Sequence, residues 1–458
     1  PPRLRKRSSM YKVKVSQSDS DQSQKLTNVS TVIYTCSDAN SEKYLQVKKV
    51  RVSTDFTGEL QQKNATVQVL QPSFVNPCSY SALIEVLRDI GRQGGVAKYG
   101  TGTRQWLVVF CDGLPYNLTA RIIKGSKTCQ TCNLVILNHR EEVAHNQSCG
   151  GRDNEAEFGW VVLHPGPGHI EMNMLRSIMD FTWEVFMKDI AMLLNFQSEK
   201  AQAAIRKVTD HHKGWAVFSV AYAALLEELL TVFIRQRLAQ VPAEESRCEL
   251  NPRDFVTFVR EAKNPNVRFM ADCLLEIMQA LAMYRTGTRD GNVPLMKAGR
   301  AVFSPQWFSR NHPLYRELDI RDELQWLQIE DPEIKELCEA FLSLNLSGVP
   351  STGEGPDFRL EEENRTAQRF MPPIPSNEDW SRVCANMDIL SKLRAGVFQD
   401  KGVQDPKEKG GCRKHDHSLE IFAVRAMIRK KGYFNNPDVP CIHTSLSGDP
   451  LDEELINL

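Results

Sequence analysis

The sequence lacks an excess of charge of either sign: its 458 residues include 57 basic and 57 acidic side chains, for a formal net charge of +0. Dedicated, high-occupancy DNA-binding proteins usually carry a strong basic excess. Any contact with nucleic acid must therefore depend on local patches. Hydrophobic residues make up 41% and charged residues 25%, which is typical of a globular chain with a sizeable core.

The sequence also lacks an uninterrupted apolar run of about 20 residues, the length that a membrane-spanning helix needs. The apolar stretch at residues 215–224 soon meets Glu227 and Glu228. We therefore expect no membrane partner.

Cysteine is sparse, because 12 cysteines in a chain of this length are too few for a disulfide scaffold. This favours a reducing, intracellular location. The opening residues have no apolar core of the secretory type. Their basic cluster predicts a nuclear-localisation signal or a phosphate-contacting arm, with a solvated tail as the alternative. The cluster consists of Arg3, Arg5, Lys6 and Arg7. The start at Pro1 leaves open that the chain is a fragment.

Composition divides the chain into an α/β part and a helical part. Residues 1–30 are basic and then rich in Ser, Asp and Gln, which predicts a disordered tail. Segments after residue 31 in which apolar and polar residues alternate predict strands. After Gly168, apolar residues that recur three or four positions apart predict helices. The expected parts are the tail (1–30), the N-terminal part of an α/β core (31–127), a zinc-finger-like insert (128–150), a core strand and helix start (151–171), a helical domain (172–346), C-terminal helices of the core (347–398) and a peripheral tail (399–458).

Four residues have the spacing of a zinc site, Cys-x2-Cys-x12-His-x3-Cys. They are Cys129, Cys132, His145 and Cys149. Two cysteines on a tight knuckle and a His and Cys one helical turn apart can close a tetrahedron around zinc. The alternatives are four unrelated side chains in a polar loop, and His139 as a competing ligand. A lone finger contacts too few base pairs to be specific, so a structural clip or an interaction knob is expected.

Asp112 directly follows five apolar residues that predict a strand. Carboxylates at strand ends sit on rigid backbone that is open to ligand, and divalent cations such as magnesium or manganese prefer oxygen ligands. Asp112 is therefore a candidate metal ligand for phosphodiester chemistry. The alternative is that Asp112 and Gly113 form a turn.

A second strand, at residues 160–163, ends in Gly-Pro-Gly-His and is followed by Glu171. His169 and Glu171 lie at the expected start of a helix, where free backbone N–H groups favour an anion such as phosphate. The alternative is ordinary helix capping with a polar first turn.

A third acidic group is expected from a later helix. Asp357 can serve as the N-cap of that helix, with Glu361 one turn on, and the alternative is a capped, solvated acidic helix. Glu227 and Glu228 are further candidates, because a carboxylate inside an apolar helix needs a partner or a metal.

Five segments between residues 76 and 386 carry a resemblance to known proteins. They are Asn-Pro-Cys-Ser-Tyr (76–80), Val-Phe-Cys-Asp-Gly-Leu-Pro-Tyr (109–116), Pro-Gly-Pro-Gly-His-Ile-Glu-Met-Asn-Met (165–174), Ser-Leu-Asn-Leu-Ser-Gly (343–348) and Gly-Glu-Gly-Pro-Asp-Phe-Arg-Leu-Glu-Glu (353–362). On these segments, residues 76–386 resemble a group of uncharacterised, transposon-derived proteins found in many copies in invertebrate animals. That group is similar to ribonuclease-H-fold transposases that are interrupted by a helical insertion.

The resemblance implies a ribonuclease-H-like mixed sheet in which Asp112 is the first carboxylate, the His169 and Glu171 region the second, and Glu361 or Glu362 the third. The sequence has Pro167 and Gly168 where an Asp is expected at the second place.

These observations predict an α/β core with a zinc-containing insert and a large all-α region. The first hypothesis is a nuclear protein that acts on DNA or RNA, with divalent ions at Asp112 and a later Glu if it cleaves phosphodiesters. The second is a non-catalytic module that binds protein or nucleic acid through the zinc insert and the helices. The sequence leaves homo-oligomerisation open.

Overall fold

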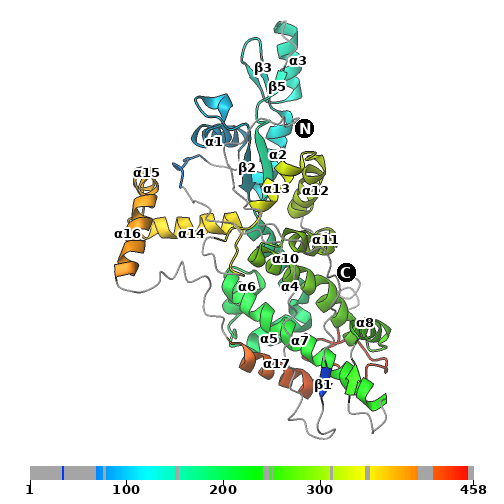
Figure 1. Cartoon of the computed structure of the whole chain (residues 1–458). Coiled ribbons are helices and arrows are strands. Elements are labelled where there is room, and N and C mark those ends of the chain that lie inside the picture. Colours follow the sequence, from blue (N-terminus) through cyan, green and yellow to red (C-terminus); the bar gives the residue numbers. More distant parts are fainter. Residues whose placement is uncertain are drawn as a thin grey trace, which may run out of the picture. The chain divides into compact units, whose positions relative to one another are not determined.

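The computed structural model describes residues 33–35, 69–75, 79–149, 154–240, 247–249, 251–309, 313–345, 351–400 and 416–451 (Figure 1). The predicted N-terminal tail and most of the strands predicted before residue 70 lie outside the described residues. The described residues are mostly helical (67%), with small sheets, which is compatible with the predicted large all-α region. The ribonuclease-H-like mixed sheet expected for the core is not confirmed: among the described residues, each small sheet is purely parallel or purely antiparallel.

The chain divides into two compact units, which are described separately. The first consists of Pro1–Lys12, Leu60–Glu171 and Met283–Lys414, and the second of Val13–Glu59, Met172–Ala282 and His415–Leu458.

Two small sheets lie in the first unit. In one, two strands run parallel, with Leu107 opposite Val161 and Cys111 opposite Pro165. The carboxyl ends of parallel strands meet at one edge, so Asp112 and Gly166 lie next to each other there. The strands are β2 (Leu107–Cys111) with β6 (Val161–Pro165), and, in the order β4-β3-β5, β3 (Lys127–Cys129), β4 (Val135–Ile136) and β5 (Asn154–Ala156).

The first unit also contains most of the helices around these sheets. They are α1 (Tyr80–Gln93), η1 (Ala97–Tyr99), α2 (Gly113–Gly125), α3 (His139–Ser148), α11 (Val293–Ser309), α12 (Pro313–Gln328), α13 (Pro332–Ala340), α14 (Pro356–Gln368), α15 (Asn377–Ala385) and α16 (Met387–Asp400).

Local sequence explains where the helices around the parallel strands begin. Ser79 accepts a hydrogen bond from the backbone N–H of Ala82 and starts α1, and Asp112 accepts one from Gly113 and starts α2. β6 is buried along its whole length, as expected for a parallel strand covered on both faces. Helices α2 and α12 contact β6, and α14 contacts β2. The two parallel strands are thus packed against helices from distant parts of the chain.

In its described residues, the second unit is helical apart from one antiparallel pair of strands. Its longest helix, α7, is long and apolar enough to cross a membrane, but 61% of its most apolar window is buried inside the fold, as in a core helix. The elements are β1 (Ile33–Thr35) paired with β7 (Arg247–Glu249), then η2 (Trp183–Met187), α5 (Lys188–Leu193), α6 (Glu199–Arg206), α7 (His211–Gln240), α8 (Pro252–Glu261), α9 (Pro265–Asp272), η3 (Cys273–Met278) and α17 (Ser418–Lys431). Two helices, α4 (Pro167–Thr182) and α10 (Gln279–Asp290), carry residues of both units.

Glu227 and Glu228 have the partners that their apolar surroundings require. Helix α17 packs on α7, where Arg425 pairs with both carboxylates and Arg429 pairs with Glu228. Glu228 is buried, so this pairing accounts for its charge without a metal.

Candidate functional site

The Cys/His quartet converges in the structure. The ligand atoms of Cys129, Cys132, His145 and Cys149 all lie within 4.8 Å of one another, so the cluster could hold a metal ion. The Sγ atoms of Cys129 and Cys149 are 4.0 Å apart, and Cys132 Sγ lies 3.2 Å from His145 Nε2. We call β3, β4, α3 and β5 together the metal knob (Figure 1).

Backbone geometry brings these four side chains together. The turn after β3 closes with Asn133 in a left-handed conformation (φ 56°), and the backbone N–H of Cys129 donates to the carbonyl of Leu134. Asn138 caps α3, which carries His145, and Cys149 is the C-cap of that helix. His139, the competing ligand, has an 89% exposed side chain near Glu142 and is not part of the group.

Electrostatics at the quartet favour a cation. The backbone N–H of Cys132 lowers the pKa of the Cys129 thiol to about 7, although burial opposes this shift. The pKa of Cys132 is raised: a backbone hydrogen bond from Leu134 lowers it, but burial and the neighbouring thiols outweigh that effect. A bound cation relieves the repulsion between neighbouring thiolates, and soft sulfur with one imidazole is the donor set of structural zinc sites.

Glu157 connects the metal knob to the rest of the unit. Its carboxylate is buried and accepts hydrogen bonds from Arg88, Tyr99 and, on β3, Thr128, while Lys98 lies 2.9 Å from it. Burial would raise the pKa of Glu157, but the bond from Thr128 and the charges of Lys98 and Arg88 outweigh it, so the pKa lies below its ordinary value of 4.5.

Replacing Glu157 with glutamine is expected to lower the free energy of unfolding by about 2–3 kcal/mol, because several charged hydrogen bonds lose their acceptor. Since the folded-state pKa is lowered, the stabilisation is complete above pH 4.5 and is lost as the pH falls through the folded pKa. Denaturation measured between pH 7 and pH 3 should show a shallower acid loss in Glu157→Gln than in the native chain. The exposed neighbour Glu155, changed to glutamine, should leave both stability and slope nearly unchanged.

The predicted site residues Asp112, His169 and Asp357 also come together, at the carboxyl ends of β2 and β6. Nδ1 of His169 is 2.8 Å from Oδ2 of Asp357, and Nε2 is 3.8 Å from Oδ2 of Asp112. Glu361, one turn along α14, is close enough for its charge to act on the imidazole. We call these four residues the acidic cluster.

Asp357 plays a different part from the one predicted. Gly355, not Asp357, is the N-cap of α14. The carboxylate of Asp357 instead accepts hydrogen bonds from the backbone N–H groups of Gly168 (3.0 Å) and His169 (2.8 Å), at the start of α4. The anion predicted at this helix start is therefore the chain's own carboxylate, which uses the unpaired N–H groups that a phosphate would otherwise find.

Glycines make this meeting of α4 and α14 possible. A Cβ at Gly166 would overlap the Asp357 carboxylate, and a Cβ at Gly168 would overlap the ring of Phe358. A Cβ at Gly355 would come within 2.8 Å of the Gly168 nitrogen. The Gly-Pro-Gly and Gly-Glu-Gly-Pro segments thus share one physical cause, the close approach of two helix starts.

Changing Gly168 to alanine is expected to destabilise the chain by about 1–3 kcal/mol, because the added methyl group must displace the Phe358 ring. The matched control is Gly396→Ala in α16, where nothing lies within 4 Å of the new Cβ. That change should stabilise the helix by about 0.5–1 kcal/mol. Thermal denaturation of the two variants checks the opposite signs, and equal effects would contradict the close approach.

Asp112 is both a helix cap and an exposed carboxylate. Its Oδ1 accepts hydrogen bonds from the Gly113 N–H (2.6 Å) and from the Tyr315 hydroxyl (3.1 Å), which leaves Oδ2 facing His169. The Asp112 side chain is 51% exposed, so Oδ2 is open to a ligand from solvent.

The acidic cluster creates a negative field around His169. Burial lowers the pKa of His169, but the hydrogen bond to Asp357 and the charges of Asp112, Asp357 and Glu361 outweigh it, so the pKa is raised. Among the described residues, no Lys or Arg forms an ion pair with any of the three carboxylates. The field therefore favours a cation at this edge.

Glu171, the remaining predicted site residue, is buried, and its carboxylate pairs with Arg285 of α10. Its charge is therefore accounted for within the protein. Of the two predicted residues His169 and Glu171, His169 is the one that contacts Asp112 and Asp357.

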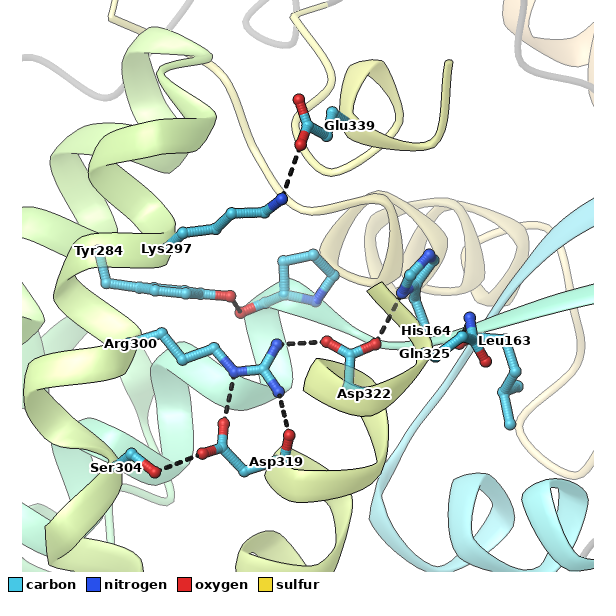
Figure 2. Close-up of polar contacts among 11 residues, drawn as sticks. Leu163, His164, Tyr284, Lys297, Arg300, Ser304, Asp319, Asp322, Gln325 and Glu339 are labelled. Atoms are coloured by element: carbon cyan, nitrogen blue, oxygen red, sulfur yellow. Dashed lines mark hydrogen bonds and ion pairs between the residues drawn. The ribbon is translucent and has the colours of Figure 1, made fainter. Parts of the chain in front are cut away.

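Sequence reasoning missed a buried polar network around His164 of β6 (Figure 2). Arg300 of α11 pairs with Asp319 and Asp322 of α12, and Asp322 is 2.7 Å from Nδ1 of His164 on β6. Burial would raise the pKa of Asp322, but the charges of Arg300 and His164 outweigh it and lower the pKa. The network fixes β6, the strand that leads into His169.

A second buried contact reaches the first residue of α4, Pro167. The hydroxyl of Tyr284, on α10, donates to the backbone carbonyl of Pro167 (3.3 Å). This places a buried anchor two residues before His169. The sequence feature that could have indicated the buried network is the presence of Asp319 and Asp322 on the same face of α12 as Leu318 and Trp326.

Comparisons with protein-family models, with curated proteins and with solved structures found no match.

Proposed function

We propose that this chain is a transposase-derived protein of the nucleus that binds DNA or RNA and cleaves or transfers phosphodiester bonds at the acidic cluster. The observation that carries the proposal is the meeting of Asp112, His169 and Asp357, which lie far apart in the sequence, at the open edge of a parallel strand pair. Nucleases of the ribonuclease-H type are expected, from the resemblance, to gather acidic groups from two strand ends and a helix. The arrangement of β2, β6 and α14 is consistent with that expectation.

The chemistry of the cluster supports phosphoryl transfer. A divalent cation at Asp112 would neutralise phosphate charge and lower the pKa of a bound water or hydroxyl group for in-line attack. The chain's own residues would orient that cation: Tyr315 fixes the Asp112 carboxylate, and Asp357 fixes the His169 imidazole.

The metal knob has a structural role in this proposal, with zinc as its ion. The Cys3His donor set fits zinc, and the ligand atoms already lie close enough to share one ion. A non-catalytic module that uses the knob for binding is the alternative, and the following experiment separates the two.

The native chain should nick or cleave single- or double-stranded DNA or RNA when manganese or magnesium is present, and chelation by EDTA should stop the reaction. Asp112→Asn keeps the capping ability of this position but removes the charge, so the rate should fall by at least about 100-fold if a positioned ligand is lost. The control is Glu330→Gln, an exposed carboxylate on the segment after α12. Retained cleavage in Asp112→Asn would contradict catalysis at the acidic cluster. Nucleic-acid binding with no cleavage in the native chain would favour the non-catalytic module.

A further inference from the structure

The hydrogen bonds of Asp357 limit what this residue can contribute to a metal site. Its Oδ1 accepts from the backbone of Gly168, and its Oδ2 accepts from both the backbone and the ring of His169. Only 10% of the side chain is exposed. Both oxygens are therefore engaged, and Asp357 is placed to orient the imidazole rather than to contact an ion.

Asp112 and His169 place one oxygen and one nitrogen next to each other. With Nδ1 directed at Asp357, the Nε2 atom of His169 faces Oδ2 of Asp112 at 3.8 Å. Two ligand atoms that each bind an ion at about 2.0–2.2 Å lie 3–4 Å apart. A carboxylate that holds the far nitrogen of a metal-binding histidine is a common arrangement, because it fixes the ring and makes the near nitrogen more basic.

We infer that the acidic cluster binds a single borderline divalent cation, of the manganese or zinc type, through Asp112 Oδ2 and His169 Nε2, with Asp357 outside the coordination sphere. This inference rests on the proposed function and specifies its cofactor. The imidazole ligand disfavours magnesium, which prefers oxygen, and the hydrogen bonds of Asp357 keep this carboxylate from bridging two ions. The positions not filled by protein are open to water or to a phosphate oxygen.

Titration of manganese into the purified full chain, with its metal knob first filled with zinc, tests the inference in the absence of nucleic acid. Manganese is a harder ion than zinc and competes poorly for thiolates, so the knob should not take part. Electron paramagnetic resonance should show one bound manganese per chain, with a pulsed-EPR coupling to an imidazole nitrogen. Magnesium should displace it only in large excess.

Three variants give the result its meaning. His169→Ala should remove the nitrogen coupling and weaken manganese binding by at least about 10-fold, and Asp357→Asn should weaken it by about 10–100-fold while retaining the coupling. Asparagine also caps helices, so this second variant keeps the start of α4. Glu330→Gln should bind as the native chain does.

Two bound manganese ions that depend on Asp112, the absence of nitrogen coupling in the native chain, or unchanged affinity in His169→Ala would each overturn the inference. The proposed function fails separately. If manganese binds with the imidazole signature but no nucleic acid is cleaved, the cation site stands and the nuclease proposal falls. If cleavage depends on Asp112 but not on His169, the reverse holds.

Discussion

Cys132→Ser is expected to abolish stoichiometric metal in the metal knob. Structural zinc sites bind with about 10–16 kcal/mol of apparent free energy, and the loss of one of three thiolates removes a large part of it. The knob has little apolar core of its own, with Ile136 as its main buried aliphatic side chain. The knob should therefore unfold locally when the metal is lost.

Metal analysis of the purified chain checks the first part, and hydrogen exchange over residues 127–149 checks the second. His139→Ala is the matched control, because His139 lies beside the quartet with an 89% exposed side chain. It should keep one metal per chain and native exchange rates. Stoichiometric metal in Cys132→Ser, or its loss in His139→Ala, would show that the ligand set is wrong.

Asp322→Asn is expected to destabilise the chain by about 3–5 kcal/mol, the cost of removing one partner from a buried ionic network. Asp322 is buried and holds both Arg300 and His164, and Nε2 of His164 has no hydrogen-bond partner in the structure. The change would leave the buried guanidinium with only Asp319 to balance it. An effect of this size is a large share of the free energy of unfolding of a typical folded chain, which is roughly 5–15 kcal/mol.

Chemical denaturation at pH 7 measures this effect. The control is Glu323→Gln, the next residue on α12, which is exposed and should change stability by less than about 0.5 kcal/mol. Similar free energies of unfolding for the two variants would show that the contacts of Asp322 with Arg300 and His164 do not stabilise the fold. Because β6 leads into His169, the Asp322 variant should also weaken cation binding at the acidic cluster.

The sequence was most informative where one short segment determines its own structure. Asp112 could be placed at a strand end because five apolar residues precede it, and the quartet could be found because its spacing alone allows a tetrahedral site. In the structure, Asp112 directly follows strand β2, and the four ligand atoms of the quartet lie close together.

The role of Asp357 could not be predicted, because it depends on a contact between residues 188 positions apart. Local rules suggested that Asp357 caps α14, whereas tertiary packing gives its carboxylate to α4. The glycines on both sides carried a usable signal, since Gly166, Gly168 and Gly355 are needed where two backbones approach.

The network of Arg300, Asp319 and Asp322 was missed for a related reason. Charged residues in a helix usually indicate a solvated face, but here Asp319 and Asp322 share the buried face of α12 with Leu318 and Trp326. Their burial is favourable because Arg300 on α11 pairs with both carboxylates. The partner of Glu171 could not be predicted either, because Arg285 comes from a distant helix.

The central claim is that Asp112 and His169 together hold a divalent cation at the edge of β2 and β6. Anomalous diffraction from crystals soaked in manganese tests it most directly. We expect one peak at about 2.0–2.3 Å from both Asp112 Oδ2 and His169 Nε2, and none in crystals of Asp112→Asn. Manganese peaks elsewhere on the chain, with no density between these two side chains, would contradict the account.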